Sequence, residues 1–235
     1  MKNSLHPALR KLKAVIFDVG GTLIHPDWRR LGALVQAETT MLFSSTQLHQ
    51  AFYAMLHVVD AELKAGVNSK RARGAHWVFL DTFKSLGIDE MKCSRIRDRL
   101  VVAHQERHLW CEPDFEAAEV LLALKAASLR TAVISNTEDG RVNESLALAD
   151  LASHLEFVID SHIVGCSKPD KKIFQIALDA LGLQPHEAAY VGDSYGYDVI
   201  GARRAGLYPI LLDRTGAYES DPELTSIRSL TELIG

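Results

Sequence analysis

The sequence contains 235 residues, 47% of them hydrophobic, and it carries a formal net charge of -4. A chain of this length can bury roughly three quarters of its unfolded surface, so we expect a compact globular protein and exclude an intrinsically disordered one. The slight acidic excess does not supply the cationic surface that binding to a phosphate backbone requires, and nucleic acid is therefore not expected as a partner.

Short apolar runs bounded by turn residues predict buried strands. In chain order these runs are residues 14–17, 131–134, 157–159, 188–191 and 209–212. Helical patterns lie between the later runs, at residues 115–127 and 171–181. Strands that alternate with helices predict an α/β fold, in which a Rossmann-like parallel sheet is covered by helices on both faces.

The stretch from residue 26 to residue 110 departs from this alternation. It contains several long amphipathic patterns instead, at residues 31–43, 47–63, 76–86 and 94–108. We therefore predict an all-helical insertion that leaves the sheet after the first strand, rejoins it near Pro113 and forms a lid. The predicted organisation is a core domain built from residues 1–25 and 111–235, with a helical cap domain at residues 26–110.

Polar residues follow several predicted strands, at the sheet edge where open parallel sheets bind their ligands. Asp18 follows the first run, Ser135 and Asn136 follow the second, and Asp193 follows the fourth, while Lys168 lies in the loop SKPDKK. Taken singly, each has a structural explanation as a helix cap, a turn former or a solvated charge. Together they bring a nucleophile, a hydroxyl, a cation and a carboxylate that suits a metal to one edge.

Four motifs occur in order along the chain, namely DVGGTL, the hydrophobic VISN, KPD and GDSYGYD. In these motifs and their order the sequence resembles the haloacid dehalogenase-like hydrolases, which are mostly phosphatases that work through an aspartyl-phosphate. The resemblance covers the predicted sheet domain nearly end to end, and the ordered set is specific although each motif alone is weak. It implies an enzyme, namely a phosphohydrolase that acts on a small phosphorylated metabolite.

The resemblance also implies catalytic roles for three residues. Asp18 would attack phosphorus, Lys168 would neutralise Asp18 and the transferring oxygens, and Ser135 would donate to one of those oxygens. The residues expected to bind substrate are Gly21, Thr22, Asn136 and Lys168, and Thr22 would also hydrogen-bond the loop after the first strand.

The same resemblance implies Mg²⁺ as the cofactor. A carboxylate that approaches a phosphate dianion is repelled by about 4 kcal/mol per charge pair at ~4 Å with an effective dielectric constant near 20, so cations must be present. The implied metal site consists of hard oxygen ligands, with Asp198 acting through a bound water. Its members are Asp18, the carbonyl of Gly20, Asp193 and Asp198.

Gly20 departs from the phosphatase pattern, in which a second Asp protonates the leaving group and then activates water. Loss of a general acid or base costs roughly 10² to 10⁴ in rate. A phosphohydrolase without it would be slow, or would act on acyl or aryl phosphates whose leaving groups need little protonation. His25 is a candidate substitute, although a turn histidine without a catalytic role is the simpler interpretation.

Two other hypotheses stay open. The carbon-halogen and carbon-phosphorus branches of the family also lack the second Asp. The haloacid dehalogenases work without metal, whereas Asp193 and Asp198 resemble a Mg²⁺ site, so they argue against halide release by this chain. The phosphonate hydrolases keep Mg²⁺ but need a cap lysine that forms a Schiff base. Candidates for that lysine are Lys64, Lys70, Lys84 and Lys92, each more simply a solvated helix charge.

The chain could instead be a catalytically impaired, phosphate-binding regulatory protein. A protein that only binds phosphate, however, does not need such a set of charged groups at one strand edge.

The predicted lid contains a basic segment, GVNSKRARGAHW, at residues 66–77. Lys70, Arg71 and Arg73 could contact a substrate anion there, or form a solvated charged face. We expect Trp77, Phe79 and Phe83 to lie in the apolar core of the insertion.

Cys93, Cys111 and Cys166 are an odd number of cysteines without close spacing, and they predict neither a disulfide framework nor a zinc site. The N-terminal MKNSLHPALRKLK lacks the apolar core of a signal peptide, and no apolar run approaches the roughly 20 residues of a membrane span. We therefore expect a reducing cytoplasm and no membrane partner. We expect a monomer or a homodimer.

Overall fold

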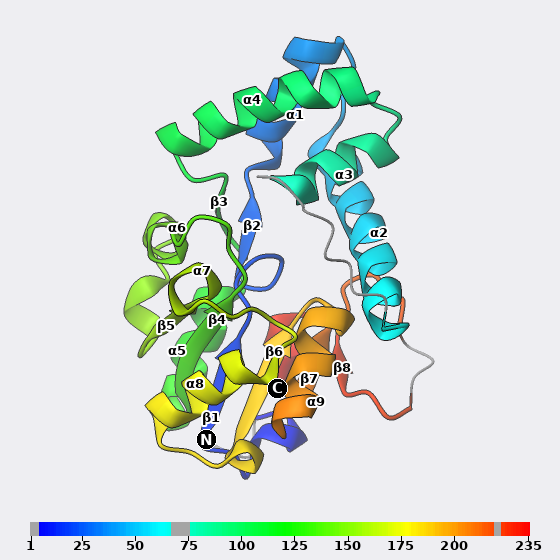
Figure 1. The fold of residues 1–235 in the computed structure, drawn as a ribbon. Helices are drawn as coiled ribbons and strands as arrows, with labels where there is room; N and C mark the ends of the chain where they lie inside the picture. The colour runs from blue at the N-terminus through cyan, green and yellow to red at the C-terminus, as the bar shows by residue number, and fades with distance from the viewer. Residues whose placement is uncertain (1–4, 67–75, 219–221) are drawn as a thin grey trace. The chain divides into compact units, whose positions relative to one another are not determined.

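The computed structural model describes residues 5–66, 76–218 and 222–235. These residues form two compact units (Figure 1). The first unit comprises the described residues of Met1–His25 and Glu112–Gly235, and the second unit comprises those of Pro26–Cys111.

The first unit is built around a parallel sheet. Among the described residues the sheet has six strands in the order β5-β4-β1-β6-β7-β8, and all neighbouring pairs are parallel. The strands are β1 (Ala14–Phe17), β4 (Arg130–Ser135), β5 (Val158–Asp160), β6 (Ala188–Gly192), β7 (Tyr208–Leu212) and β8 (Ser226–Ile227). Every residue of β1 and of β6 is buried, as expected for strands covered on both faces. The predicted α/β fold with a parallel sheet is confirmed.

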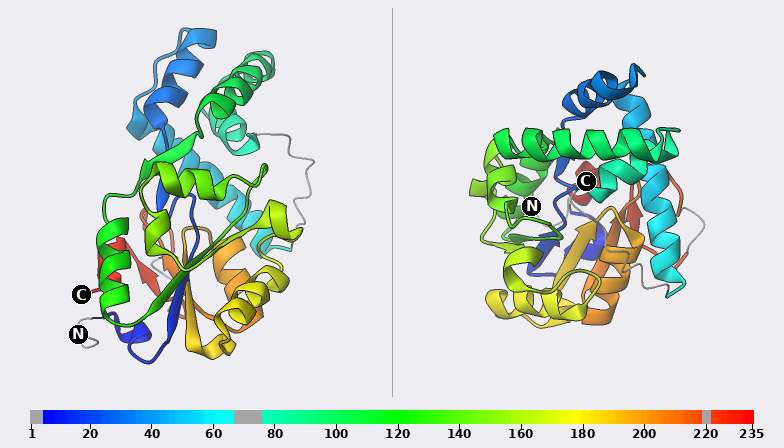
Figure 2. Two further views of the ribbon diagram at one scale, coloured as in Figure 1. Left: turned by 90° about the vertical axis from the view of Figure 1, so that its left-hand side faces the viewer. Right: turned by 45° about the horizontal axis from the view of Figure 1, so that its top comes forward.

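Helices cover both faces of this sheet. The helices of the first unit are α5 (Ala117–Ala126), α6 (Val142–Leu148), α7 (Ser161–Val164), α8 (Lys171–Leu181) and α9 (Ile200–Ala205). Figure 2 shows the sheet between α5 on one side and α8 and α9 on the other. Shorter helical turns are η2 (Pro7–Leu9), η3 (Ala152–His154), η4 (Pro185–Glu187), the π-helical η5 (Tyr195–Val199) and η6 (Leu230–Leu233).

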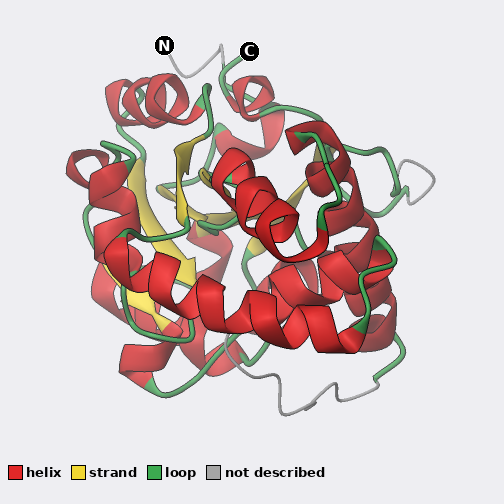
Figure 3. Cartoon of the chain, turned by 90° about the horizontal axis from the view of Figure 1, so that it is seen from above, coloured by secondary structure: helices red, strands yellow, loops and turns green. Residues whose placement is uncertain are grey.

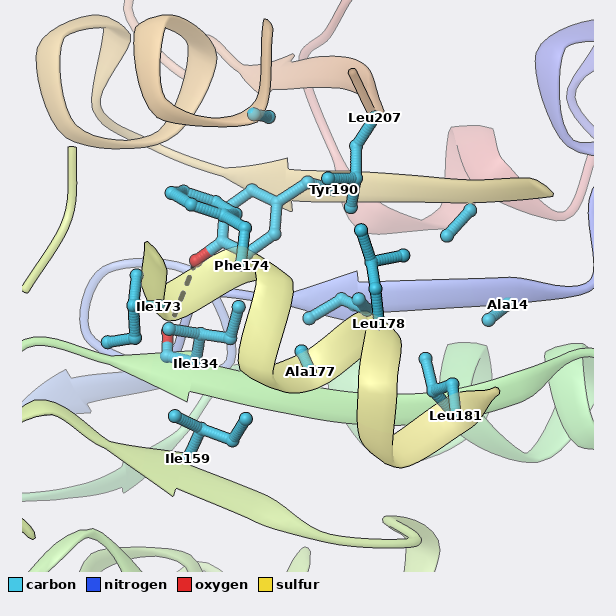
Figure 4. Packing of buried hydrophobic residues seen from close by; sticks show 13 residues of the cluster. Ala14, Ile134, Ile159, Ile173, Phe174, Ala177, Leu178, Leu181, Tyr190 and Leu207 are labelled. Carbon is cyan, nitrogen blue, oxygen red and sulfur yellow. Dashed lines mark hydrogen bonds between the residues drawn. The ribbon is translucent and has the colours of Figure 1, made fainter. Parts of the chain in front are cut away.

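Helix α8 packs an apolar face against the sheet of the first unit. This helix begins after Asp170, whose side chain accepts a hydrogen bond from Lys172 N at 2.9 Å, and ends at Gly182 with φ of +63°. Its buried residues are Ile173, Phe174, Ala177, Leu178 and Leu181. They pack against residues of β1, β4 and β6 in one apolar cluster (Figure 4). This cluster places the carboxyl ends of those strands in a rigid frame.

The regular structure of the second unit is mainly helical (Figure 3). Its helices are α1 (Trp28–Thr39), α2 (Ser45–Lys64), α3 (Trp77–Ser85) and α4 (Glu90–Glu106). Phe79 and Phe83 are fully buried in its apolar core, as expected, whereas Trp77 is only partly buried and lies outside that cluster. The unit therefore has an apolar core of its own.

Two short strands connect the units. These are β2 (Ile24–Pro26) and β3 (Trp110–Pro113), which pair with one another. The amide of Asp114 donates to the carbonyl of Leu23 at 2.9 Å, so the chain leaves and re-enters the first unit at neighbouring points. In the part of the chain that the structure describes, no helix is both long and apolar enough to cross a membrane.

Candidate active site

Asp18 follows β1 directly and is buried. Its backbone amide donates to the carbonyl of Val191 at 2.8 Å, which fixes it beside the end of β6. Thr22 Oγ1 donates to Asp18 Oδ2 at 3.4 Å, across the tight turn that follows the strand. Thr22 thus supports the turn, as the sequence suggested, and its predicted contact with substrate stays a prediction.

Gly21 lies in this turn with φ of +88°, a conformation that side-chain-bearing residues rarely adopt. A Cβ atom at this position would lie 2.0 Å from Asp193 Oδ2. The absence of a side chain at Gly21 therefore allows the turn after β1 to approach the carboxylate that follows β6. Gly20 forms an isolated bridge with Ile24, and its role as a carbonyl ligand stays a prediction.

Lys168 bonds both to Asp18, which follows β1, and to Asp198 in η5. Its ammonium group donates to Asp18 Oδ1, to Asp198 Oδ1 at 2.8 Å and to the hydroxyl of Tyr190 at 3.0 Å. The side chain is only 3% exposed, so these interactions form in a low dielectric environment, where they are stronger than in water. The predicted pairing of Lys168 with Asp18 is present in the structure.

Asn136 holds the backbone of Lys168. The amide of Lys168 donates to Asn136 Oδ1 at 2.9 Å, and Asn136 Nδ2 donates to the carbonyl of Lys168 at 3.1 Å. The end of β4 therefore positions the loop that carries the lysine. Ser135, the last residue of β4, is buried beside Asn136.

Three carboxylates gather at this edge of the sheet. Asp18, Asp193 and Asp198 each offer an oxygen, and these oxygens lie within 4.8 Å of one another. The π-helical turn η5 brings Asp198 back toward Asp193, and the amide of Ser194 donates to Asp198 Oδ2 at 3.0 Å. A cluster of carboxylate oxygens suits a hard divalent cation such as Mg²⁺, which prefers oxygen ligands. The donor set therefore fits the metal that the resemblance implies.

The charges of the site are unevenly balanced. Burial raises the pKa of Asp18 to about 6, and Asp198 acts in the same direction, while Lys168 only partly opposes them. Burial also acts to lower the pKa of Lys168, but the carboxylates of Asp18 and Asp198 outweigh it and hold that pKa well above its ordinary value. One ammonium group, bonded to two of them, thus accompanies a cluster of three carboxylates. The excess negative charge is what a divalent cation would offset.

A second polar cluster lies where the connecting strands meet the first unit. His25 Nε2 lies 3.0 Å from Asp114 Oδ2, and Arg214 Nη2 donates to the same oxygen at 2.5 Å. Burial acts to raise the pKa of Asp114, but the hydrogen bond with His25 and the charge of Arg214 outweigh it and lower that pKa. This contact gives His25 a structural role between β2 and the segment after β3, the simpler of its two interpretations.

The four lysines considered for Schiff-base chemistry lie in different surroundings. Lys84 pairs with Glu90 at 2.7 Å and Lys92 pairs with Asp89 at 3.0 Å, both on the surface of the second unit. Lys64 ends α2. Lys70 lies outside the described residues, as do Arg71 and Arg73 of the basic segment.

The sequence patterns did not identify Tyr190 as part of the site. It occupies the middle of the buried strand β6, where its ring suits an apolar environment. Burial raises its pKa well above the ordinary value, so the phenol is neutral. The only signal in the sequence is a hydroxyl within the otherwise apolar run AAYV, since such a group needs a hydrogen-bond partner when buried.

The combination of this sheet, this insertion and this cluster of acidic residues around a lysine defines a class of hydrolases. The family described as haloacid dehalogenase-like hydrolase matches residues 12–206, and the chain belongs to that family. The chain is 30% identical over 231 residues to (S)-2-haloacid dehalogenase 4A of Burkholderia cepacia, an alignment that covers 94% of this chain and 93% of that protein.

A phosphatase also resembles the chain. The phosphoserine phosphatase of Thermus thermophilus is 38% identical over 130 residues, which are 55% of this chain and 51% of that protein. The crystal structure of a dehalogenase with an intermediate complex shares the fold with a TM-score of 0.65 at 23% identity, covering 95% of this chain and 96% of that one. The proteins similar to this chain therefore include both a dehalogenase and a phosphatase.

Proposed function

We propose that this hydrolase is a Mg²⁺-dependent phosphohydrolase in which Asp18 is the nucleophile. The observation that carries the proposal is the cluster of Asp18, Asp193 and Asp198 oxygens within 4.8 Å of one another. A site for a divalent cation is of use to a reaction at phosphorus, because the cation offsets the repulsion between nucleophile and phosphate. When bound, Mg²⁺ would be held by the carboxylates of Asp18 and Asp193, and it would supply that charge.

The residues of the chain then divide the reaction between them. An oxygen of Asp18 forms a bond to phosphorus, and the bond between phosphorus and the leaving oxygen breaks with its electron pair on that oxygen. Lys168 holds Asp18 in place through its hydrogen bond, and Ser135 donates to a phosphoryl oxygen. Water then cleaves the aspartyl-phosphate, which releases inorganic phosphate and restores the carboxylate.

Gly20 determines the substrate class that we propose. Because Gly20 has no side chain to protonate the leaving group, the departing oxygen has to carry its negative charge or take a proton from water. Aryl and acyl phosphates release oxyanions that are stable enough for this. We therefore propose that small phosphorylated compounds of these kinds are the substrates that the protein turns over fastest.

Dehalogenation of a 2-haloacid is the second candidate, because a dehalogenase aligns with nearly the whole chain. Such a substrate also carries a carboxylate. In the described site Lys168 is already bonded to two carboxylates, so a further organic anion would be repelled unless a cation were added. The charge balance therefore favours the phosphohydrolase.

The test is a series of aryl phosphates with graded leaving-group pKa, assayed for phosphate release with Mg²⁺ and with a chelator. We expect Mg²⁺-dependent turnover that falls steeply as the leaving group becomes more basic, and none with Asp18→Asn. Chloride release from a 2-haloacid in the presence of chelator would favour the second candidate instead. A rate independent of leaving-group pKa would show that another group replaces the missing acid.

A further inference from the structure

Tyr190 carries a polar group that the family motifs leave without a role. The residue is 1% exposed, and its ring lies against Phe174 of α8 with centroids 4.9 Å apart (Figure 4). A phenylalanine ring would fill the same apolar space. The hydroxyl is the part of Tyr190 that needs an explanation, because a buried hydroxyl is costly unless it is hydrogen-bonded.

The hydroxyl of Tyr190 makes two hydrogen bonds. It accepts from Lys168 Nζ at 3.0 Å and donates to the carbonyl of Ile134 at 3.1 Å, the bond that Figure 4 shows as a dashed line. Ile134 belongs to β4, and β4 and β6 lie on opposite sides of β1. The phenol therefore reaches across β1, and it ties the lysine to a rigid backbone group rather than to a mobile side chain.

The other partners of Lys168 explain why this tie matters. An ammonium group has three N–H donors, and here they point to Asp18, Asp198 and Tyr190. Two of these acceptors are charged and the third is neutral. Without the neutral acceptor, one donor would be left unpaired in a buried place, and the ammonium group could shift between the two carboxylates.

We infer that Tyr190 is a positioning residue, which holds Lys168 Nζ where it bonds the nucleophile Asp18. This inference rests on the proposed function, since it assigns to Tyr190 an effect on phosphoryl transfer. Tyr190 acts through Lys168 and does not itself touch the substrate.

The direct test is Tyr190→Phe, which keeps the ring and removes both hydrogen bonds. Because displacing a catalytic group by about 1 Å can cost on the order of 10²-fold, we expect kcat to fall by about 10- to 100-fold. KM should stay within about twofold, because substrate binding does not involve the hydroxyl. The matched control is Ile159→Val in the same apolar cluster, which should lower the melting temperature by a few degrees and leave kcat unchanged.

Two further variants separate positioning from a general loss of structure. Combined with Lys168→Met, Tyr190→Phe should lower the residual rate no further, because residues that act as a unit are not additive. The amino acid 4-aminophenylalanine at position 190 keeps a polar group in the same place, so it should restore part of kcat. It also serves as the variant of choice if phenylalanine does not yield folded protein.

The outcomes distinguish the inference from the function on which it rests. Wild-type protein without Mg²⁺-dependent turnover would remove both. Active wild-type protein with an unchanged kcat in Tyr190→Phe would remove the inference alone, as would an equal loss in Ile159→Val. An additive effect of Tyr190→Phe in the Lys168→Met background would also contradict it.

Discussion

Asp18 follows a fully buried strand, and burial raises its pKa from the ordinary 3.8 to about 6 even though Lys168 lies beside it. An acid whose pKa is raised on folding stabilises the folded state fully below its unfolded pKa, and this contribution is lost as the pH rises through the folded pKa. Ionised Asp18 therefore lowers the free energy of unfolding at neutral pH, by about 3 kcal/mol at most. The buried position of Asp18 thus disfavours the ionised carboxylate, which is the form that would act as the nucleophile.

Replacing this carboxyl group should stabilise the protein while abolishing its activity. In a chelator, we expect Asp18→Asn to unfold at higher urea concentration than wild type at pH 8, with the difference disappearing near pH 4. Urea unfolding of the wild type and of Asp18→Asn between pH 4 and pH 8 measures this difference in stability. Asp179→Asn, an exposed change on α8, should shift the free energy by less than about 0.5 kcal/mol. A destabilised Asp18→Asn protein at pH 8 would contradict the explanation.

The residues of the site differ in how far the sequence reveals them. Asp18, Ser135 and Asp193 each follow an apolar run, and parallel strands bring such residues to one edge. Tyr190 lies inside such a run, and its partners are remote in sequence, so only the folded structure shows its contacts. The same is true of Arg214 and Asp114, whose ion pair depends on how distant loops meet.

At the scale of the elements, apolar patterns predicted positions better than boundaries. The strand at residues 14–17 and the helix at residues 171–181 agree with β1 and α8. In contrast, α4 begins at Glu90, several residues before the predicted start at 94, because Asp89 caps a polar first turn that an apolar pattern does not mark. The two-residue β8 and the paired β2 and β3 were missed, since strands this short leave little pattern.

The turn between β1 and β2 offers a test of the proposed metal site. Gly21→Ala would place a Cβ atom 2.0 Å from Asp193 Oδ2, whereas Gly182, with φ of +63°, has nothing within 4 Å of the same position. Both alanine variants should lose about 1–3 kcal/mol of stability from backbone strain. Only Gly21→Ala should also lose the rise in melting temperature on adding Mg²⁺, which thermal unfolding measures. A retained rise would show that Asp193 does not hold the ion.

At the scale of the molecule, the described residues that form the site belong to a single unit. The strands that carry Asp18 and Asp193, the loop of Lys168 and the apolar cluster beneath them all lie in the first unit. The inserted unit has a separate apolar core, and its two connecting strands pair with each other. Each unit therefore has the internal contacts that an independently folding domain needs.

We accordingly expect the first unit to fold without the inserted one. In a variant lacking residues 26–111, His25 would be joined to Glu112 by a glycine-containing linker of about four residues, the length of an ordinary hairpin loop. It should unfold cooperatively, and Mg²⁺ should still raise its melting temperature, because the carboxylate cluster is intact. Asp193→Asn in the same shortened chain is the control and should abolish that rise. If the shortened chain did not fold while the full chain did, the stability of the sheet would depend on the inserted unit.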